Sequence, residues 1–256
     1  MMGLLRAEWL KTRRTVLRFL VFVLPLLIGA VLGGYIAARS WLISPSGAFS
    51  GFFSGWGALV MPVAIAMVAG QLVHEEEQAG SFGGLLLCAK PRWQLYMSKF
   101  VMLVLAVVVA TALAVGMFCL VLWLGGFQHG GFDVYAQAAV ACILAAVPLA
   151  AFHLWLAFAA GLGVSVGVGM GGLLVAAFIG GTLLGDKIWP FVPWAWPVRM
   201  ASAAAIVRTP GIDAAALAFF MERVHLACAV VVFSGILLIA GGLWWFSRWN
   251  GRHTSE

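Results

Sequence analysis

Residues 74–99 read HEEEQAGSFGGLLLCAKPRWQLYMSK and form a polar stretch between two long apolar runs. Charged residues make up only 9% of the whole chain, so this concentration of charge stands out. Glu75, Glu76 and Glu77 open the stretch, an apolar patch follows at 85–87, and basic residues lead into the next apolar run. This order predicts a short amphipathic helix along a membrane face, with its acidic residues at the positive end of the helix dipole. The alternative is a solvated loop whose charges only keep it out of lipid.

The composition identifies the class of protein. Hydrophobic residues make up 64% of the chain and the mean hydropathy is +1.06, whereas a soluble domain is roughly half apolar. The formal net charge is +6, but the basic residues cluster beside apolar runs. This pattern favours contact with membrane lipid and control of orientation over nucleic-acid binding. The four cysteines show no metal-ligand spacing, so we predict no metal site and no cofactor in this chain.

Six apolar runs are long enough to cross a bilayer, because a helix of about 20 residues spans the hydrocarbon core. The first run is too long for the apolar core of a signal peptide, so we interpret it as a retained span. We therefore predict an all-α polytopic membrane protein with one domain over 1–256, beginning with an interfacial helix at 1–15. The predicted spans are residues 16–38, 52–73, 99–124, 137–160, 163–184 and 224–246.

The distribution of lysine and arginine predicts the orientation. With a cytoplasmic N-terminus, ten of these residues fall in cytoplasmic segments and five in external segments. The positive-inside rule then puts both termini and the segment 74–98 in the cytoplasm.

The second informative stretch is residues 185–223, which contain Trp189, Trp194 and Trp196. Three prolines within eight residues exclude a continuous helix here, and the tryptophans favour a membrane interface. We predict a pair of short helices that dip back into the outer leaflet as an external re-entrant segment. A plain external loop is the alternative. Glu222 is predicted to lie at the start of the last span.

Two features lie inside the predicted spans. The fifth span is rich in glycine, and Gly163, Gly167 and Gly171 recur every four residues, so one helix face is nearly bare. Such a face predicts close helix packing, either static or mobile. His153 lies near the middle of the fourth span, where polar residues are functional candidates. It has no carboxylate three or four residues away, which favours a neutral histidine hydrogen-bonded to another helix over substrate or proton chemistry.

Enzymatic motifs are absent or out of context. The sequence contains no GxxxxGK[ST] loop for nucleotide phosphates. Residues 163–167 match the GxSxG pattern, but that motif needs a strand–turn–helix setting, not a glycine-rich span. We predict no catalytic residues, and any ATP dependence must come from another subunit.

These features together resemble an ABC-2 type transporter permease. Within that group the chain is most similar to the lantibiotic-protection permeases of bacteria, which act in bacteriocin immunity. Three stretches carry the resemblance: residues 5–27, residues 75–99, and residues 189–200, which read WPFVPWAWPVRM. The matching positions in the first two stretches are Glu8, Lys11, Arg13, Arg14, Thr15 and Pro25, and Glu76, Gly80, Leu86, Pro91 and Lys99.

The resemblance implies six spans in a type V exporter-like arrangement, in the cytoplasmic membrane of a bacterium. It implies a permease that pairs with a second permease, identical or homologous, and with two copies of a cytosolic ATPase subunit that binds ATP and Mg²⁺. Residues 74–92 would form the coupling helix on the ATPase. The implied ATPase contacts are Glu75, Glu76, Glu77, Leu85, Leu86 and Arg92, and the candidate substrate contacts are Trp189, Trp194, Trp196, His153 and Glu222.

By this resemblance, the predicted function is export of a lantibiotic-type antimicrobial peptide, for self-immunity or resistance. One alternative is export of another drug, a lipid or a glycolipid. A more distant alternative is a stand-alone membrane enzyme that uses His153. That enzyme would need a nucleophile or carboxylate deep in the bundle, whereas the acidic residues lie in loops or at span ends.

Overall fold

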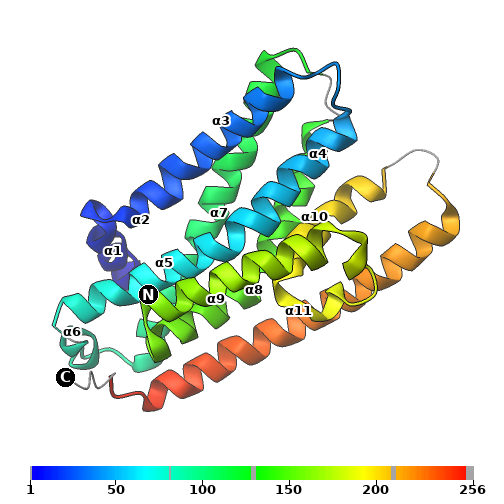
Figure 1. Cartoon of the computed structure of the whole chain (residues 1–256). Coiled ribbons are helices and arrows are strands. Elements are labelled where there is room, and N and C mark those ends of the chain that lie inside the picture. The colour runs from blue at the N-terminus through cyan, green and yellow to red at the C-terminus, as the bar shows by residue number, and fades with distance from the viewer. Residues whose placement is uncertain (1, 81, 128–130, 209–211, 252–256) are drawn as a thin grey trace.

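The computed structural model describes residues 2–80, 82–127, 131–208 and 212–251, and this part of the chain folds into helices alone. Six of these helices are long and apolar enough to cross a membrane (Figure 1), which confirms the all-α polytopic fold and the predicted number of spans for the described residues. The spans are Val16–Ala37, Pro45–Gln78, Arg92–Leu124 (α7), Phe132–Ala160 (α8), Leu162–Gly180 and Ala214–Arg248 (α11).

Three of the spans contain a wider π-helical turn, which interrupts the first and second spans and ends the fifth. The first consists of α2 (Val16–Arg18), η2 (Phe19–Val23) and α3 (Leu24–Ala37). The second consists of α4 (Pro45–Phe53), η3 (Ser54–Val60) and α5 (Met61–Gln78), and the fifth of α9 (Leu162–Val175) and η4 (Ala176–Gly180). The shorter elements are α1 (Met2–Lys11), η1 (Thr12–Arg14), α6 (Gly83–Leu86), η5 (Leu183–Gly185), η6 (Trp189–Phe191), η7 (Pro193–Ala195) and α10 (Trp196–Ile206).

Two of the π turns have an identifiable cause. Pro25 follows η2 by two residues, and Pro62 follows η3 by two residues. A proline in a helix has no N–H to donate, and its ring clashes with the carbonyl four residues earlier. A wider turn ahead of the proline relieves that clash without breaking the helix.

The second and fourth spans form the centre of the bundle. α5 packs against α8 and α9, while α8 also contacts α7, α10 and α11. In its most apolar window the second span is 61% buried, whereas the last span is only 17% buried. The last span therefore leaves most of its surface uncovered by the rest of this chain.

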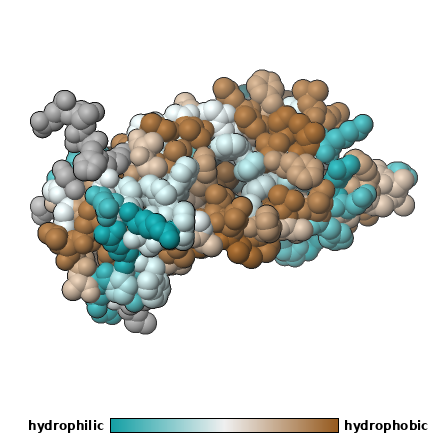
Figure 2. Space-filling model, turned by 90° about the horizontal axis from the view of Figure 1, so that it is seen from below, coloured by the Kyte–Doolittle hydropathy of each residue, from teal (hydrophilic) through white to brown (hydrophobic). Residues whose placement is uncertain are grey.

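The two ends of the bundle differ in their small elements (Figure 1). α1, α6 and the C-terminal end of α11 lie together at one end, which we call the α6 end. The start of α4, the end of α10 and the start of α11 lie at the other, the α10 end. Figure 2 shows hydrophilic residues gathered toward both ends, with hydrophobic surface between them. The position of α1 at a membrane interface and the cytoplasmic side of the α6 end stay predictions.

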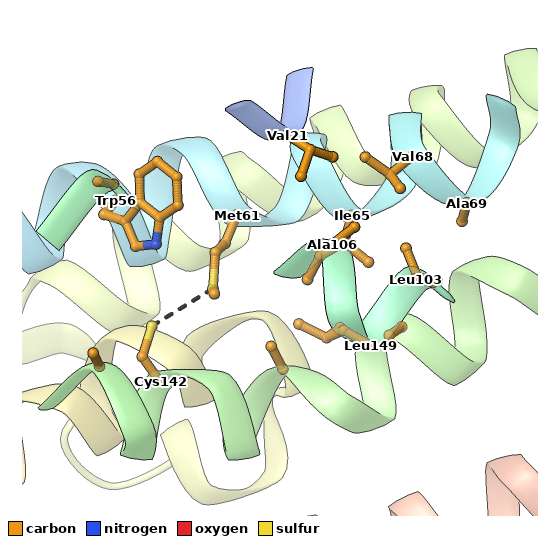
Figure 3. Close-up of a cluster of buried hydrophobic side chains, with 14 of the residues drawn as sticks. Val21, Trp56, Met61, Ile65, Val68, Ala69, Leu103, Ala106, Cys142 and Leu149 are labelled. Atoms are coloured by element: carbon orange, nitrogen blue, oxygen red, sulfur yellow. Dashed lines mark hydrogen bonds between the residues drawn. The ribbon is translucent and has the colours of Figure 1, made fainter. Parts of the chain in front are cut away.

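The core where η2, α5, α7 and α8 meet is almost entirely apolar (Figure 3). Ile65 from α5 and Ala106 from α7 lie side by side in it, and the thiol of Cys142 on α8 donates to Met61 Sδ over 3.5 Å. Close packing of such side chains is the main force that can hold helices together in lipid.

Several helices are longer than the hydropathy predicts. The second span begins at Pro45 instead of 52, because Ser44 accepts a hydrogen bond from the Gly47 amide and a proline suits the first turn. The last span begins at Ala214 instead of 224, because Asp213 caps it by accepting from the Ala216 amide. Hydropathy places a boundary at polar or charged residues, such as Ser50 in the second span and Glu222 and Arg223 in the last, so it misses the helical turns before them. Glu222 therefore lies inside α11 and not at its start, which corrects the prediction.

The glycines of the fifth span pack on a different face from the one predicted. Gly163, Gly167 and Gly171 are exposed, and a Cβ atom at any of them would meet nothing within 4 Å. Gly169 is buried instead, and its Cβ atom would lie 2.5 Å from Cβ of Ala66 on α5. Within this chain, the face with glycines every four residues is not the packing face.

Candidate functional site

The stretch 74–92 does not form one helix, so the predicted amphipathic helix is wrong. α5 continues to Gln78, α6 contains only Gly83–Leu86, and α7 begins at Arg92. Gly80 follows the end of α5 with φ +117°, a backbone conformation open to glycine and strained for other residues. The three glutamates consequently occupy the last turn of α5, at the negative end of its dipole and not at a positive end.

A network of four charges, three of them buried and the fourth exposed, ties this region together. Lys99 on α7 is 1% exposed, and its Nζ donates to Glu8 Oε2 (2.9 Å), to Glu76 Oε1 (2.8 Å) and to the Leu72 carbonyl (3.1 Å). Lys11 Nζ lies 2.5 Å from Glu76 Oε1 and 3.5 Å from Glu8 Oε1. We call these four charged side chains the ion network. It joins α1, the end of α5 and the start of α7.

The charges of the ion network balance, which is the condition under which charges tolerate burial. Burial opposes the charge of Lys11, but its hydrogen bond to Glu76 and the charges of Glu8 and Glu76 outweigh this effect, so the pKa of Lys11 is raised. Glu76 is 6% exposed and fully engaged by two lysines. Among the residues predicted to contact the ATPase, Glu76 is thus held inside the permease.

The two neighbouring glutamates occupy other faces of the same helical turn. Glu75 and Glu77 are half-buried. Glu77 Oε2 lies 3.4 Å from His74 Nδ1, and Gln78 Nε2 lies 2.9 Å from His74 Nε2. Both glutamates thus keep part of their surface at the α6 end.

Phe82, just before α6, anchors the segment in an aromatic cluster. It is 2% exposed and has φ 66°, the only positive φ of a described residue other than glycine. Its ring centroid lies 4.9 Å from that of Trp249 and 6.4 Å from that of Phe158. Phe158 belongs to α8, and Trp249 follows α11. A left-handed backbone costs a phenylalanine about 1–2 kcal/mol, and burial of its ring offsets that cost.

Arg92 binds the end of α11. Its Nη1 donates to the carbonyls of Trp249 (2.6 Å) and Ser247 (3.2 Å), and both terminal nitrogens lie 3.4 Å from Asn250 Oδ1. The last carbonyls of a helix lack partners within it and are well satisfied by a cation. Arg92 therefore joins the start of α7 to the end of α11, a role that the sequence did not indicate.

The surface left open at the α6 end follows α6. Leu85 is 5% exposed and Leu86 is half-buried, whereas Leu87 is 88% exposed. Leu85 and Leu86 end the four-residue helix α6 and Leu87 follows it, and the sequence pattern could not indicate which of the three leucines faces outward. The exposed set, which we call the α6 surface, is Gly84, Leu87, Cys88, Ala89, Lys90 and Pro91.

His153 lies far from the α6 surface, inside the bundle. It is fully buried, and its Nδ1 lies 3.2 Å from Ser165 Oγ on α9. Ser165 Oγ donates to the Ala66 carbonyl over 3.1 Å, so its oxygen is left to accept from Nδ1–H of His153. These bonds link α8, α9 and α5, the arrangement expected of a neutral histidine hydrogen-bonded to another helix.

The tryptophans of the re-entrant segment separate into two kinds. Trp189 is 1% exposed and Trp196 is 2% exposed, with its Nε1 donating to the Pro190 carbonyl over 2.9 Å. These two are packed inside the protein, so the prediction that they face the membrane interface is wrong. The predicted pair of short helices is a series of single turns followed by α10. Trp194 is half-buried and lines an apolar cavity of about 220 Å³ together with Pro148, Leu149, Phe152, Pro193, Trp196, Ser234 and Leu238.

Glu222 and possible metal ligands complete the set of candidates. Glu222 is exposed on α11, near the α10 end. Within residues 2–80, 82–127, 131–208 and 212–251, no three side chains of His, Cys, Asp or Glu gather to hold a metal ion.

Residues 4–183 match the model of a protein family described as ABC-2 family transporter protein. The match includes the ion network, the α6 surface and the first five spans. None of the curated proteins matches the chain. Membrane permeases of this family carry no ATPase site, and ATP is bound by a partner ATPase subunit. The chain thus belongs to the ABC-2 family transporter proteins, as the membrane permease component of such a transporter.

Proposed function

We propose that this permease expels a lantibiotic-type antimicrobial peptide, driven by an ATPase subunit that binds the α6 surface from the cytoplasm. The docking site rests on one observation, which is that Leu87 is 88% exposed. The residues on either side of this segment, Phe82 and Arg92, are instead held against the bundle. An exposed leucine beside Lys90 offers an apolar anchor with a polar rim, which is typical of protein interfaces. Glu75 and Glu77 lie near enough in sequence to contribute to the rim.

The contacts around α6 suggest how force from the ATPase reaches the spans. Phe82 connects the segment to α8 and α11 through its aromatic neighbours. The helices on either side of α6 are joined to α1, because Glu76 on α5 binds Lys11 and Lys99 on α7 binds Glu8. Arg92 connects it to α11 a second time. A push on the α6 surface would therefore tilt several spans together instead of bending one loop.

A second permease completes the proposed transporter, identical to this chain or homologous to it. The exposed face of Gly163, Gly167 and Gly171 supports this assembly, because small residues permit close approach of another helix.

The cavity beside Trp194 supports a hydrophobic or amphipathic cargo. Its lining is apolar except for the Ser234 hydroxyl, and it lies between α8, η7 and α11. An apolar side chain of a peptide would fill it, and so would a drug or an acyl chain. Export of another drug, lipid or glycolipid therefore remains the second candidate function.

Docking on the α6 surface predicts a large effect of Leu87→Asp. Purification of the tagged chain from its native membranes in mild detergent should recover an ATPase subunit and a second permease. We expect Leu87→Asp to reduce recovery of the ATPase subunit about 30-fold, because an interface anchor contributes about 2 kcal/mol or more. The matched control is Leu183→Asp, since Leu183 is 86% exposed and belongs to η5, outside the α6 surface.

Cys88 provides an independent measurement of the same contact. Cys88 is exposed on the α6 surface. Cys228 is also exposed but lies within the last span, on α11, whereas Cys119 and Cys142 are buried, so Cys228→Ser provides the background for this measurement. A membrane-impermeant maleimide should label Cys88 in inside-out vesicles, and added ATPase subunit should protect it. Equal ATPase recovery by the Leu87 and Leu183 variants, or unprotected labelling, would contradict docking at this surface.

The proposed cargo site predicts that Trp194→Ala lowers peptide resistance. We expect the inhibitory concentration of a lantibiotic to fall at least fivefold in cells that carry the permease with its ATPase, which corresponds to about 1 kcal/mol of binding. Trp41→Ala is the control, because Trp41 is 77% exposed and lines no cavity described here. Protection by the wild type against hydrophobic drugs but not against lantibiotics would replace the peptide with the second candidate cargo.

A further inference from the structure

An apolar groove runs beneath α1, apart from the α6 surface and the Trp194 cavity. Its inner part has a volume of about 190 Å³ and its outer part about 440 Å³, and the two share Trp9, Met102 and Leu105. An apolar cavity of about 150 Å³ already holds a molecule the size of benzene. The inner part is lined by Trp9, Leu17, Val21, Phe22, Val68, Leu72, Met102, Leu105, Ala106 and Val109.

The inner wall of the groove belongs to the packed core, so the groove has a fixed shape. Val21, Val68 and Ala106 come from η2, α5 and α7 and point toward one another (Figure 3). The outer part is open, and exposed side chains such as Leu10 (63%) and Leu105 (47%) line it. If α1 lies at the membrane interface, as the sequence predicts, the groove beside it opens where the acyl chains of a lipid meet its headgroup.

Two arginines lie beside this groove, Arg6 in its lining and Arg18 against its lining residue Trp9. Arg6 lines the outer part and is exposed, and no carboxylate among the described residues pairs with it. The guanidinium of Arg18 lies 4.8 Å from the Trp9 ring centroid, and its Nη2 donates to the Trp9 carbonyl over 3.3 Å. The Nε atom of Arg18 is buried and has no hydrogen-bond partner in the described part of the chain. Lys11, by contrast, is held by the ion network.

We infer that this groove binds an anionic diacyl phospholipid from the leaflet that surrounds α1. One acyl chain fills the inner part between η2, α5 and α7. The phosphate lies at the exposed Arg6 and at the terminal nitrogens of the half-buried Arg18, and it neutralises two cations that no carboxylate of the described residues pairs with. The lipid thereby connects α1 to α7 beside Lys99. The inference concerns the membrane-embedded permease itself and holds whatever its cargo is.

The groove and the cations select this occupant together. A zwitterionic lipid could supply the acyl chain but no net negative charge for the arginines. A soluble anion such as free phosphate could meet the arginines but would leave the apolar inner part unfilled. Each arginine near a membrane surface strengthens the binding of anionic lipid about fivefold, so the preference for net negative charge is measurable.

The test counts lipids bound to the purified full-length permease by native mass spectrometry, with phosphatidylglycerol or phosphatidylcholine added at equal concentrations. We expect one tightly bound phosphatidylglycerol per chain and weaker binding of phosphatidylcholine. Arg6→Gln should lower the phosphatidylglycerol preference about fivefold, and Arg6→Lys should retain it. Arg6 is exposed, so neither variant disturbs the packing.

Filling the groove gives a second, independent readout. Leu105→Trp places a larger ring in the groove and should reduce retention of both lipids at least fivefold. Leu120→Trp is the matched control, because Leu105 and Leu120 both lie on α7 and are 47% and 46% exposed. Equal retention of the two lipids by the wild type, or equal retention by the two tryptophan variants, would overturn the inference.

Discussion

Lys99→Met is expected to lower the free energy of unfolding of the permease by about 3–5 kcal/mol. Lys99 is 1% exposed and binds both carboxylates of the ion network, Glu8 at 2.9 Å and Glu76 at 2.8 Å. Methionine fills a similar volume but brings no charge. Two buried carboxylates would then share Lys11 alone, and removing one partner of a buried ion pair costs far more than the intact pair contributes.

Thermal or denaturant unfolding in mild detergent measures this effect, and Lys90→Met is the matched control. Lys90 is exposed on the α6 surface, so the same substitution should change stability by less than about 0.5 kcal/mol there. Adding Glu8→Gln to Lys99→Met should recover part of the loss, because it removes the carboxylate left without a cation. If the Lys99 and Lys90 variants unfold alike, the ion network does not hold α1 to α7.

Phe82→Ala is expected to lower stability by about 3–5 kcal/mol and to uncouple the ATPase from the spans. The ring of Phe82 packs between Phe158 and Trp249, and alanine would leave a cavity there. The α6 surface would remain, so the ATPase subunit should still copurify. ATP hydrolysis stimulated by cargo should fall, because the connection from α6 to α8 and α11 is lost.

The backbone of Phe82 provides an internal control for this argument. Because φ is 66°, alanine at this position retains the left-handed strain, whereas glycine adopts the conformation freely. We expect Phe82→Gly to be about 1 kcal/mol more stable than Phe82→Ala, although it removes more atoms. Phe191→Ala, at a residue that is 63% exposed in η6, should leave both stability and stimulated ATP hydrolysis unchanged. Cargo-stimulated hydrolysis at the wild-type rate in Phe82→Ala would refute its coupling role.

The ion network illustrates how far sequence reasoning reaches. Glu8, Lys11, Glu76 and Lys99 are among the residues that carry the resemblance to ABC-2 permeases, so the sequence indicated that they matter. It could not indicate that they bind one another, because Glu8 and Lys99 are 91 residues apart. The prediction that Glu76 faces a partner protein was wrong for this reason.

The segment after α5 illustrates the same limit at short range. The amphipathic pattern of residues 74–92 predicted one helix, but Gly80 and Pro91 divide it into a helix end, α6 and a helix start. The signals for these breaks were present in the sequence. Which of Leu85, Leu86 and Leu87 faces outward depends instead on Phe82, which fixes the orientation of α6 from within the aromatic cluster.

The sequence by itself determined that the protein is a helical membrane protein, that it resembles an ABC-2 permease, and that the part of the chain described has six helices long and apolar enough to cross a membrane. The helical spans follow from the apolar length of each run, because a helix satisfies its own backbone hydrogen bonds within a bilayer. The resemblance follows from the residues of three stretches, 5–27, 75–99 and 189–200. Only the tertiary structure decided that Glu76 and Arg92 bind within the permease, that Trp189 and Trp196 are buried, and that Leu87 is exposed. The orientation of a side chain is set by which helices meet, and those contacts join residues far apart in the chain.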